Sequence, residues 1–218
     1  MLQKIGMPGF EAVSHPVPEA IKALEQIMRS NRHPIVAEIG VGIGATTREL
    51  LRTMNGSGEL HLFDYASTVN SLVTAIDQAE LAKGVKIIAH GNTPHTFNSY
   101  AWKLAMTLKE AGKACFDLAF LDGAHTFVHD APATCMLKEL VKPGGYIVFD
   151  DVYWTFARSP TMNPTKRSDI AEKYSEEQIN TPHIKLIIQT LVLTDPRFIS
   201  VDLIGGASTR AVFRRTTS

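Results

Sequence analysis

The stretch that decides the fold is Glu38-Ile39-Gly40-Val41-Gly42-Ile43-Gly44. It continues an apolar run over residues 35–39 that predicts a buried strand, and it precedes a helical pattern over residues 45–54. Glycines at a strand-to-helix turn let the backbone approach a ligand closely, and the first amides of the helix can bind polar groups. Asp64 ends the next predicted strand 20 residues after Gly44. Because an acidic residue at that distance can accept both hydroxyls of a ribose, the pattern predicts a nucleoside-binding turn.

Strands and helices alternate outward from this turn. We predict strands at residues 35–39, 59–64, 85–89, 116–121 and 146–149. The helices between and before them are predicted at 45–54, 67–82, 128–141, a stripe from Phe97 to Leu108, and a segment that starts at Pro16 or Pro18. Two further strands, at 198–204 and 209–214, flank Gly205-Gly206 and predict a β-hairpin. The fold class is therefore α/β, a Rossmann-like doubly wound seven-stranded sheet, mostly parallel with an antiparallel C-terminal hairpin strand.

Composition restricts the domain organisation and the partners. The 218 residues suit one compact domain, and 22 basic residues balance 22 acidic ones, so a nucleic-acid partner is disfavoured. No apolar run reaches a membrane span and no signal peptide is visible, which favours a cytoplasmic protein. We expect an N-terminal leader and helix at 1–34 and a single domain at 35–218. Within that domain, residues 152–182 form a loop-rich lid or acceptor insertion with a helix near 168–179.

Three carboxylates follow two predicted strands. Asp122 comes directly after residues 116–121, and Asp150 and Asp151 follow residues 146–149. Because these strands are neighbours in a sheet of this type, the three side chains should converge beside the central crevice. They would repel one another unless a cation lies among them, and a hard ion such as Mg²⁺ could bind and acidify a substrate hydroxyl. The alternative is that these acidic residues only end strands and cap the following helices.

Glu38 helps to distinguish a dinucleotide from S-adenosylmethionine as the ligand of this turn. An acidic residue is an unusual neighbour for the pyrophosphate of a dinucleotide, but it could bind the ammonium group of a methionyl moiety, directly or through water. With the terminal hairpin, it makes residues 35–215 resemble the class I S-adenosylmethionine-dependent methyltransferases. The other residues that carry this resemblance are the glycine turn, Asp64, Gly91-Asn92 and the run at 140–145. The resemblance implies a cofactor site that comprises Glu38, Gly40, Gly42, Gly44, Asp64, Gly91, Asn92 and Asp122, with Gly91-Asn92 near the adenine, although many members carry an acidic residue in place of Asn92.

The sequence Asp122-Gly123-Ala124-His125, followed by Asp150-Asp151, resembles the macrocin-type O-methyltransferases of sugar and antibiotic tailoring. This resemblance implies that Asp122, Asp150 and Asp151 hold Mg²⁺ beside the methyl donor. Many relatives have an aspartate where this chain has Ala124, so the carboxylate proposed as their general base is missing. Either another residue takes the proton, or the metal alone acidifies the hydroxyl sufficiently. We expect His125 to be the base because its ordinary pKa is near 6.5, with Asp151 as the alternative; His129, four residues on, shares its helical face.

These observations favour an O-methyltransferase that uses S-adenosylmethionine and Mg²⁺ on a hydroxyl of a small molecule, such as a sugar, a phenol or a natural-product intermediate. Three alternatives stay open: a metal-independent N-methyltransferase, a nicotinamide-dependent oxidoreductase and a non-catalytic nucleotide-binding module. A homodimer or higher homo-oligomer is also expected, since an N-terminal helix outside the sheet often docks on a partner subunit in this class.

Overall fold

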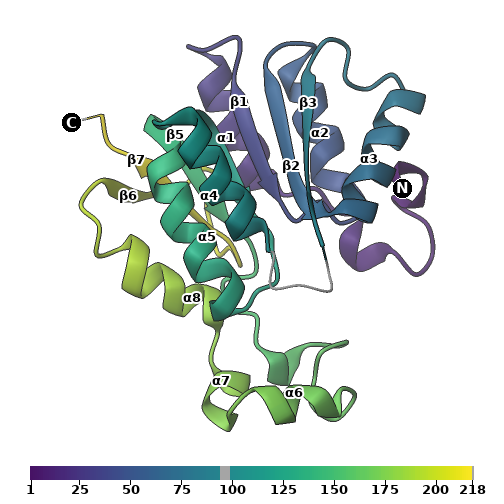
Figure 1. The fold of residues 1–218 in the computed structure, drawn as a ribbon, viewed down its shortest axis with the longest axis vertical. Coiled ribbons are helices and arrows are strands. Elements are labelled where there is room, and N and C mark those ends of the chain that lie inside the picture. Colours follow the sequence, from purple (N-terminus) through teal and green to yellow (C-terminus); the bar gives the residue numbers. More distant parts are fainter. Residues whose placement is uncertain (94–98, 218) are drawn as a thin grey trace.

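The computed structural model describes residues 1–93 and 99–217. Its sheet has seven strands in the order β3-β2-β1-β4-β5-β7-β6 (Figure 1). The first five strands are parallel to their neighbours, and β7 runs antiparallel to both β5 and β6. This confirms the predicted sheet. The strands are β1 (Ile35–Ile39), β2 (Glu59–Tyr65), β3 (Lys86–Asn92), β4 (Phe116–Leu121), β5 (Val141–Phe149), β6 (Phe198–Val201) and β7 (Ala211–Arg215).

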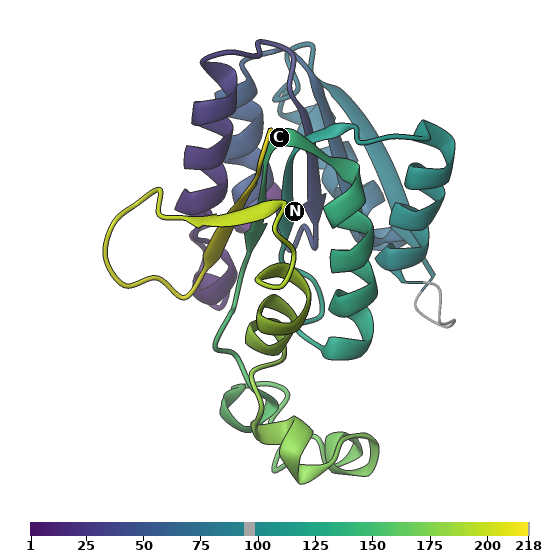
Figure 2. The same cartoon turned by 90° about the vertical axis from the view of Figure 1, so that its left-hand side faces the viewer.

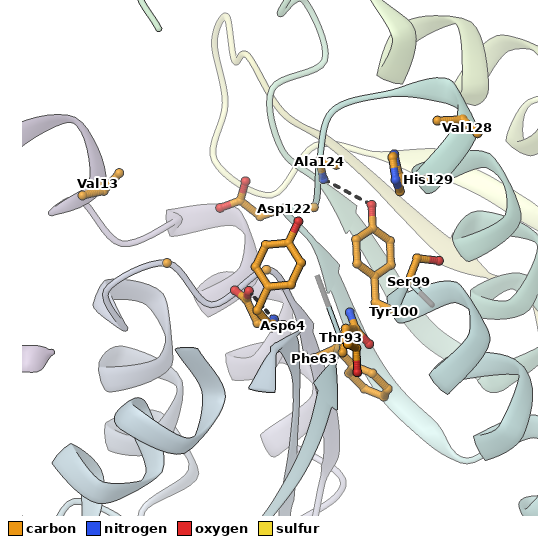
Figure 3. A pocket seen from close by; sticks show the side chains of 15 residues that line it. Val13, Phe63, Asp64, Thr93, Ser99, Tyr100, Asp122, Ala124, Val128 and His129 are labelled. Carbon is orange, nitrogen blue, oxygen red and sulfur yellow. Dashed lines mark hydrogen bonds between the residues drawn. The ribbon is translucent and has the colours of Figure 1, made fainter. Parts of the chain in front are cut away.

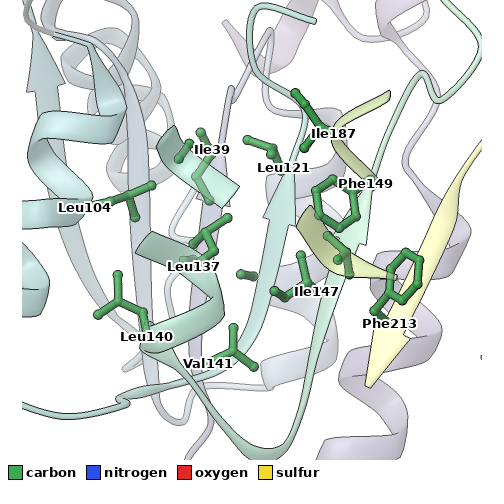
Figure 4. Close-up of a cluster of buried hydrophobic side chains, with 14 of the residues drawn as sticks. Ile39, Leu104, Leu121, Leu137, Leu140, Val141, Ile147, Phe149, Ile187 and Phe213 are labelled. Carbon is green, nitrogen blue, oxygen red and sulfur yellow. The ribbon is translucent and has the colours of Figure 1, made fainter. Parts of the chain in front are cut away.

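Helices cover both faces of the sheet (Figures 1 and 2). One face carries α1 (Pro18–Met28), α2 (Ala45–Met54) and α3 (Ala66–Gln78), and the other carries α4 (Tyr100–Ala111), α5 (Phe127–Leu140) and α8 (His183–Ile187). Each face buries its own apolar cluster because the parallel strands are apolar on both sides. Figure 4 shows part of the cluster beneath α4, α5 and α8.

The N-terminal segment joins this core. The apolar face of α1 packs within the chain, with Ala20, Ala23 and Leu24 fully buried. Leu2 of the leader also packs against the cluster under α1 to α3. The apolar face of α1 is thus covered by the chain's own sheet and by α2.

The strand register positions the functional residues. Ile39 pairs with Leu121, and Leu121 pairs with Phe149, so β1, β4 and β5 end side by side. The next residues continue the pairing, because the amide of Asp122 donates to the carbonyl of Ile39 (2.8 Å) and that of Asp150 to the carbonyl of Leu121 (3.0 Å). Acidic side chains at two strand ends are thereby placed beside the glycine turn.

The insertion differs from its prediction. The expected helix at 168–179 is two helices, α6 (Ser168–Lys173) and α7 (Glu176–Asn180), which lie beyond the end of the sheet in Figure 1. Ser175 starts the second one, since its hydroxyl accepts from the Gln178 amide (3.3 Å) while the Gln178 side chain accepts from the Ser175 amide (2.9 Å). The pattern Ser175-Glu176-Glu177-Gln178 is a capping box, and it interrupts the apolar periodicity.

Other boundaries also differ. The α8 helix and the π-helical turn at Ile188–Val192 were not predicted, β5 begins five residues earlier than expected, and the hairpin strands are shorter or displaced. Phe97, expected in the stripe that forms α4, lies outside the described residues. No helix within the described ranges is long and apolar enough to cross a membrane.

Candidate functional site

A cavity of about 570 Å³ opens at the carboxyl ends of the parallel strands (Figure 3). Fifteen residues line it, and five of them belong to the predicted cofactor set: Gly40, Gly42, Asp64, Asn92 and Asp122. The volume lies within the range usual for small-molecule sites, which is about 300–1,000 Å³. This cavity therefore lies where the sequence predicts a ligand crevice, after β1, β2 and β4.

The glycines of the turn have different roles. A Cβ on Gly40 would overlap the carbonyl oxygen of Asp122, so this glycine allows β1 and β4 to end in contact. Gly42 has a φ of +50° and no atom within 4 Å of its Cβ position, so its open side belongs to the cavity. Gly44 does not line the cavity; a Cβ there would lie 2.6 Å from Leu72. Gly91 likewise packs, because its Cβ would lie 2.8 Å from the Cα of Ala66.

Asp64 and Asn92 give the cavity its polar wall. One oxygen of Asp64 accepts from the Val41 amide (2.9 Å) and the other from the Tyr65 amide (2.6 Å), which fastens β2 to the glycine turn. Each carboxylate oxygen keeps a further lone pair for a ligand. Asn92 is 3% exposed, and its Oδ1 has no hydrogen-bond partner among the described residues. A buried acceptor without a partner is costly, so Asn92 points to a ligand that supplies a donor.

Glu38 is placed differently from the other predicted cofactor residues. Its side chain is 1% exposed and accepts a hydrogen bond from the Thr47 hydroxyl (2.7 Å), which links β1 to α2. Burial raises the pKa of Glu38 to about 8. It does not line the cavity. In this arrangement Glu38 stabilises the base of the glycine turn.

The three predicted carboxylates are brought together. The Asp151 amide donates to Oδ1 of Asp150 (2.8 Å), and the guanidinium Nε of Arg210 lies 3.0 Å from the same oxygen. Burial, and then the negative charges of Asp150 and Asp151, raise the pKa of Asp122 well above its usual range. Burial also raises the pKa of Asp150, and Arg210 opposes that shift. The cluster is therefore crowded with negative charge that Arg210 only partly compensates.

The donor chemistry of this cluster fits a hard divalent cation. Carboxylate oxygens are the ligands that Mg²⁺ prefers, and a cation would relieve the repulsion that raises the pKa of Asp122. Within residues 1–93 and 99–217, no group of three or more His, Cys, Asp or Glu side chains is arranged so that it could hold a metal ion. Asp150 is instead faced by Arg210. The cluster therefore fits a divalent cation in the type of its donor atoms and in its charge, and not in the arrangement of its side chains.

His125 lies between two members of the cluster. Its Nε2 is 3.5 Å from an oxygen of Asp122 and 3.7 Å from an oxygen of Asp151. Its Nδ1 is buried without a hydrogen-bond partner in the described part of the chain, and its ring is 5.6 Å from that of Trp154. His129 lines the cavity, and its Nδ1 pairs with the Thr126 hydroxyl (2.7 Å). The imidazole of His125 is thereby directed at the cluster, as its proposed role requires.

A buried network holds the loop that carries Asp122 and His125. The Tyr100 hydroxyl donates to Oδ1 of Asp130 and accepts from the Ala124 amide (3.2 Å), as Figure 3 shows for the second bond. The other Asp130 oxygen accepts from the Thr126 amide (3.0 Å). The sequence predicts Tyr100 only as part of a helical stripe and predicts no role for Asp130. The other cavity residues that the sequence does not predict are Val13, Phe63, Tyr65, Thr93, Ser99, Gly123 and Val128.

The insertion is attached next to this loop. His183 is 3% exposed; its Nδ1 accepts from the Phe127 amide (3.1 Å) and its Nε2 pairs with the Gln178 carbonyl (2.8 Å). Its ring also contacts that of Phe156, with centroids 5.6 Å apart. His183 therefore fastens α7 to the start of α5, and ordinary packing accounts for it. Tyr153, in contrast, is 52% exposed.

Comparisons with known proteins agree with this fold. A family described as a methyltransferase domain matches residues 37–152, which is just over half of the chain, so the chain belongs to that family. The resemblance to class I S-adenosylmethionine-dependent methyltransferases is thereby confirmed. A highly reducing polyketide synthase of Alternaria alternata is 25% identical over 154 residues, a match that spans 66% of this chain and 5% of the synthase.

Solved structures share the fold at low identity. An O-methyltransferase from Bacillus cereus, in complex with S-adenosylhomocysteine, is 17% identical with a TM-score of 0.61, covering 99% of this chain and 90% of that one. TomG from Streptomyces achromogenes, an O-methyltransferase of tomaymycin synthesis in complex with S-adenosylmethionine, is 18% identical with a TM-score of 0.62, covering 99% and 89%. MycE of mycinamycin biosynthesis, in complex with Mg and S-adenosylhomocysteine, is 17% identical with a TM-score of 0.55, covering 98% of this chain and 52% of MycE.

Proposed function

We propose that this protein transfers the methyl group of S-adenosylmethionine to a hydroxyl of a small molecule, and that a divalent cation such as Mg²⁺ assists. The observation that carries the proposal is that the cavity is continuous with the group formed by Asp122 and His125. The cavity lined by Gly42, Asp64 and Asn92 extends to Asp122, and Asp122 is 3.5 Å from the imidazole of His125. A methyl donor in the first and an acceptor at the second would lie side by side.

The donor would occupy the cavity. Asp64 would accept the ribose hydroxyls, and the unpartnered Asn92 carbonyl would accept a donor from the adenine end of the molecule. Gly42 leaves room for the ligand because nothing lies within 4 Å of its Cβ position. Asp122, at the other end of the wall, would face the positively charged sulfonium, whose attraction to a carboxylate strengthens in a site shielded from water.

The acceptor would bind on the side of His125. In-line displacement requires the hydroxyl oxygen about 3 Å from the methyl carbon and opposite the sulfur, so positioning supplies much of the rate. His125 would take the hydroxyl proton at Nε2, and the carboxylates of Asp122 and Asp151 would stabilise the resulting imidazolium. Trp154, whose ring is 5.6 Å from that of His125, would shape the acceptor pocket together with the rest of the 152–182 insertion.

Asp122, Asp150 and Asp151 would hold the cation. When bound, Mg²⁺ would lower the pKa of a coordinated hydroxyl and orient it. Because Ala124 lacks a carboxylate, the proton would be accepted by His125 or, as the alternative, by Asp151, unless the cation alone acidifies the hydroxyl sufficiently.

The test is calorimetric titration of S-adenosylhomocysteine into the purified protein, once with Mg²⁺ and once with EDTA. We expect micromolar binding in both, since the cavity that would hold the nucleoside is separate from the cation ligands Asp150 and Asp151. Hydroxylated sugars, phenols and natural-product intermediates would then be screened with labelled donor, with and without EDTA. A folded protein without affinity in either titration would contradict the proposal, and turnover of amines alone would replace O- by N-methylation.

A further inference from the structure

Arg210 lies beside the carboxylate cluster, immediately before β7. Its Nε is 3.0 Å from Oδ1 of Asp150 and 3.7 Å from Oε2 of Glu19. The antiparallel register explains the first distance: Ala211 pairs with Phe149, so the adjoining residues Arg210 and Asp150 leave the ladder side by side. The backbone itself therefore presents this guanidinium to the cluster.

Glu19 holds Arg210 from the other side. It belongs to the first turn of α1 and is only 6% exposed. Ser208 connects the two residues, because its hydroxyl donates to Oε1 of Glu19 (2.5 Å) and accepts from the Arg210 amide (3.0 Å). A buried carboxylate without a cation nearby would be costly, so Glu19 needs Arg210 as much as Asp150 does.

Neither ion pair is completed by a hydrogen bond. Nε of Arg210 and Oε2 of Glu19 are both buried, yet neither has a hydrogen-bond partner within the described ranges. The guanidinium is thus held between two carboxylates mainly by charge, and a small displacement toward Glu19 would improve one pair at the expense of the other. Asp150 has a single Arg or Lys partner among the ion pairs of the described residues, and that partner is Arg210.

We propose that Arg210 is a built-in competitor for the divalent cation at Asp150, and that Glu19 accepts its guanidinium when the cation binds. The inference rests on the cation site proposed above. A guanidinium and a divalent cation both neutralise Asp150, and they repel each other when they share it. Cation binding therefore requires Arg210 to give up Asp150, so Arg210 weakens cation affinity while Glu19 strengthens it.

Mn²⁺ is a suitable probe because it binds hard oxygen sites and its free concentration can be followed by electron paramagnetic resonance. We would compare Arg210→Gln, Glu19→Gln and Arg214→Gln in the full chain. Arg214 is the matched control, since it is an exposed arginine four residues further along, in β7, whose guanidinium stacks over Tyr146. Removing the competitor should tighten Mn²⁺ binding on the order of ten-fold, and Glu19→Gln should weaken it on a similar scale. Arg214→Gln should change it by no more than about two-fold.

The double variant Glu19→Gln/Arg210→Gln removes the buried pair as a unit, so it covers the case in which Arg210→Gln alone fails to fold. It should also bind Mn²⁺ more tightly than the natural chain. Unchanged or weaker binding in the folded arginine variants would overturn the proposal, as would equal tightening by Arg214→Gln. S-Adenosylhomocysteine is titrated into every sample. Nucleoside binding without any Mn²⁺ binding rejects the cation site and with it the role of Arg210, but leaves the methyl-donor site standing. Absence of nucleoside binding in the natural chain rejects the proposed function itself.

Discussion

His125 and Asp151 face each other, and both have left-handed backbone conformations. Their φ values are +55° and +50°, and Nε2 of His125 is 3.7 Å from Oδ2 of Asp151. A non-glycine residue in this region costs on the order of 1–3 kcal/mol and persists only where the surrounding structure enforces it. Here the Tyr100–Asp130 network fixes the loop of His125, and the pairing of β5 with β7 fixes the start of the Asp151 loop. Strain on both sides of one contact supports the proposed roles of His125 and Asp151.

The role of His125 as base can be separated from its strained backbone by His125→Asn. Asparagine tolerates a positive φ better than most residues, so the loop should keep its conformation while the imidazole is lost. We expect turnover to fall on the order of 10²–10⁴-fold, and the acidic limb of the pH–rate profile to disappear. Steady-state rates across pH, measured with an acceptor from the screen, check both expectations.

His129→Asn is the matched control, because His129 is nearby and lines the same cavity. It should keep the acidic limb. If the control loses the limb and His125→Asn retains it, the proton goes to His129 and our assignment is wrong.

Gly42 provides a test of the donor cavity. A Cβ at Gly42 meets no other atom, so Gly42→Ala adds a methyl group that only a bound ligand would encounter. We expect affinity for S-adenosylhomocysteine to fall at least about ten-fold, as for one badly placed group in a close-packed site. The positive φ should cost about 1 kcal/mol of folding stability. Calorimetry and chemical denaturation measure the two effects separately.

The control for strain is Gly112→Ala. Gly112 ends α4 with a φ of +63°, and its Cβ position is equally open, but it does not line the cavity. It should lose similar stability and no nucleoside affinity. Equal affinity losses in both variants would mean that strain, and not the cavity, explains the result at Gly42.

The sequence predicts the parts of this site that depend on parallel strands. The periodicity locates the ends of β1, β4 and β5, and parallel register then brings Gly40, Asp122 and Asp150 to one edge. It does not predict the position of Arg210, because the register of β7 on β5 depends on the course of the segment at 202–210, and periodicity does not determine that course. It also misses Tyr100 with Asp130, since only the packing of α4 on α5 shows that residues 30 positions apart share a hydrogen bond.

Tyr100→Phe tests how the loop of Asp122 and His125 is held. The change leaves Asp130 and the Ala124 amide without the hydroxyl, and an unsatisfied buried group costs about 1–3 kcal/mol of unfolding free energy. Burial raises the pKa of Asp130, and the bond from Tyr100 opposes that shift. The folded variant should therefore hold its Asp130 proton to higher pH, which makes the loss of stability larger at pH 8 than at pH 5.

Urea denaturation at the two pH values measures this difference. Tyr153→Phe is the control, because it removes a hydroxyl from a side chain that is 52% exposed, and it should change stability by less than about 0.5 kcal/mol. Equal losses for Tyr100→Phe at both pH values would show that Asp130 is not the group left unpaired.

The buried Glu38 should make the free energy of unfolding depend on pH near neutrality. Burial raises its pKa in the folded state from 4.5 to about 8, so between these values the folded chain holds a proton that the unfolded chain releases. The contribution is fully present below about pH 4.5 and is lost as pH rises to 8, at up to about 1.4 kcal/mol per pH unit. Glu38→Gln mimics the protonated side chain and still accepts from Thr47, so it should remove this slope and leave the variant more stable than the natural chain at pH 8.

The difference in unfolding free energy between the two proteins, measured from pH 5 to pH 8, isolates Glu38 from the other titrating groups. Glu25, whose side chain is 42% exposed, should leave the slope intact when changed to Gln. A flat difference for Glu38→Gln would mean that Glu38 is ionised in the folded protein and available to a cationic ligand.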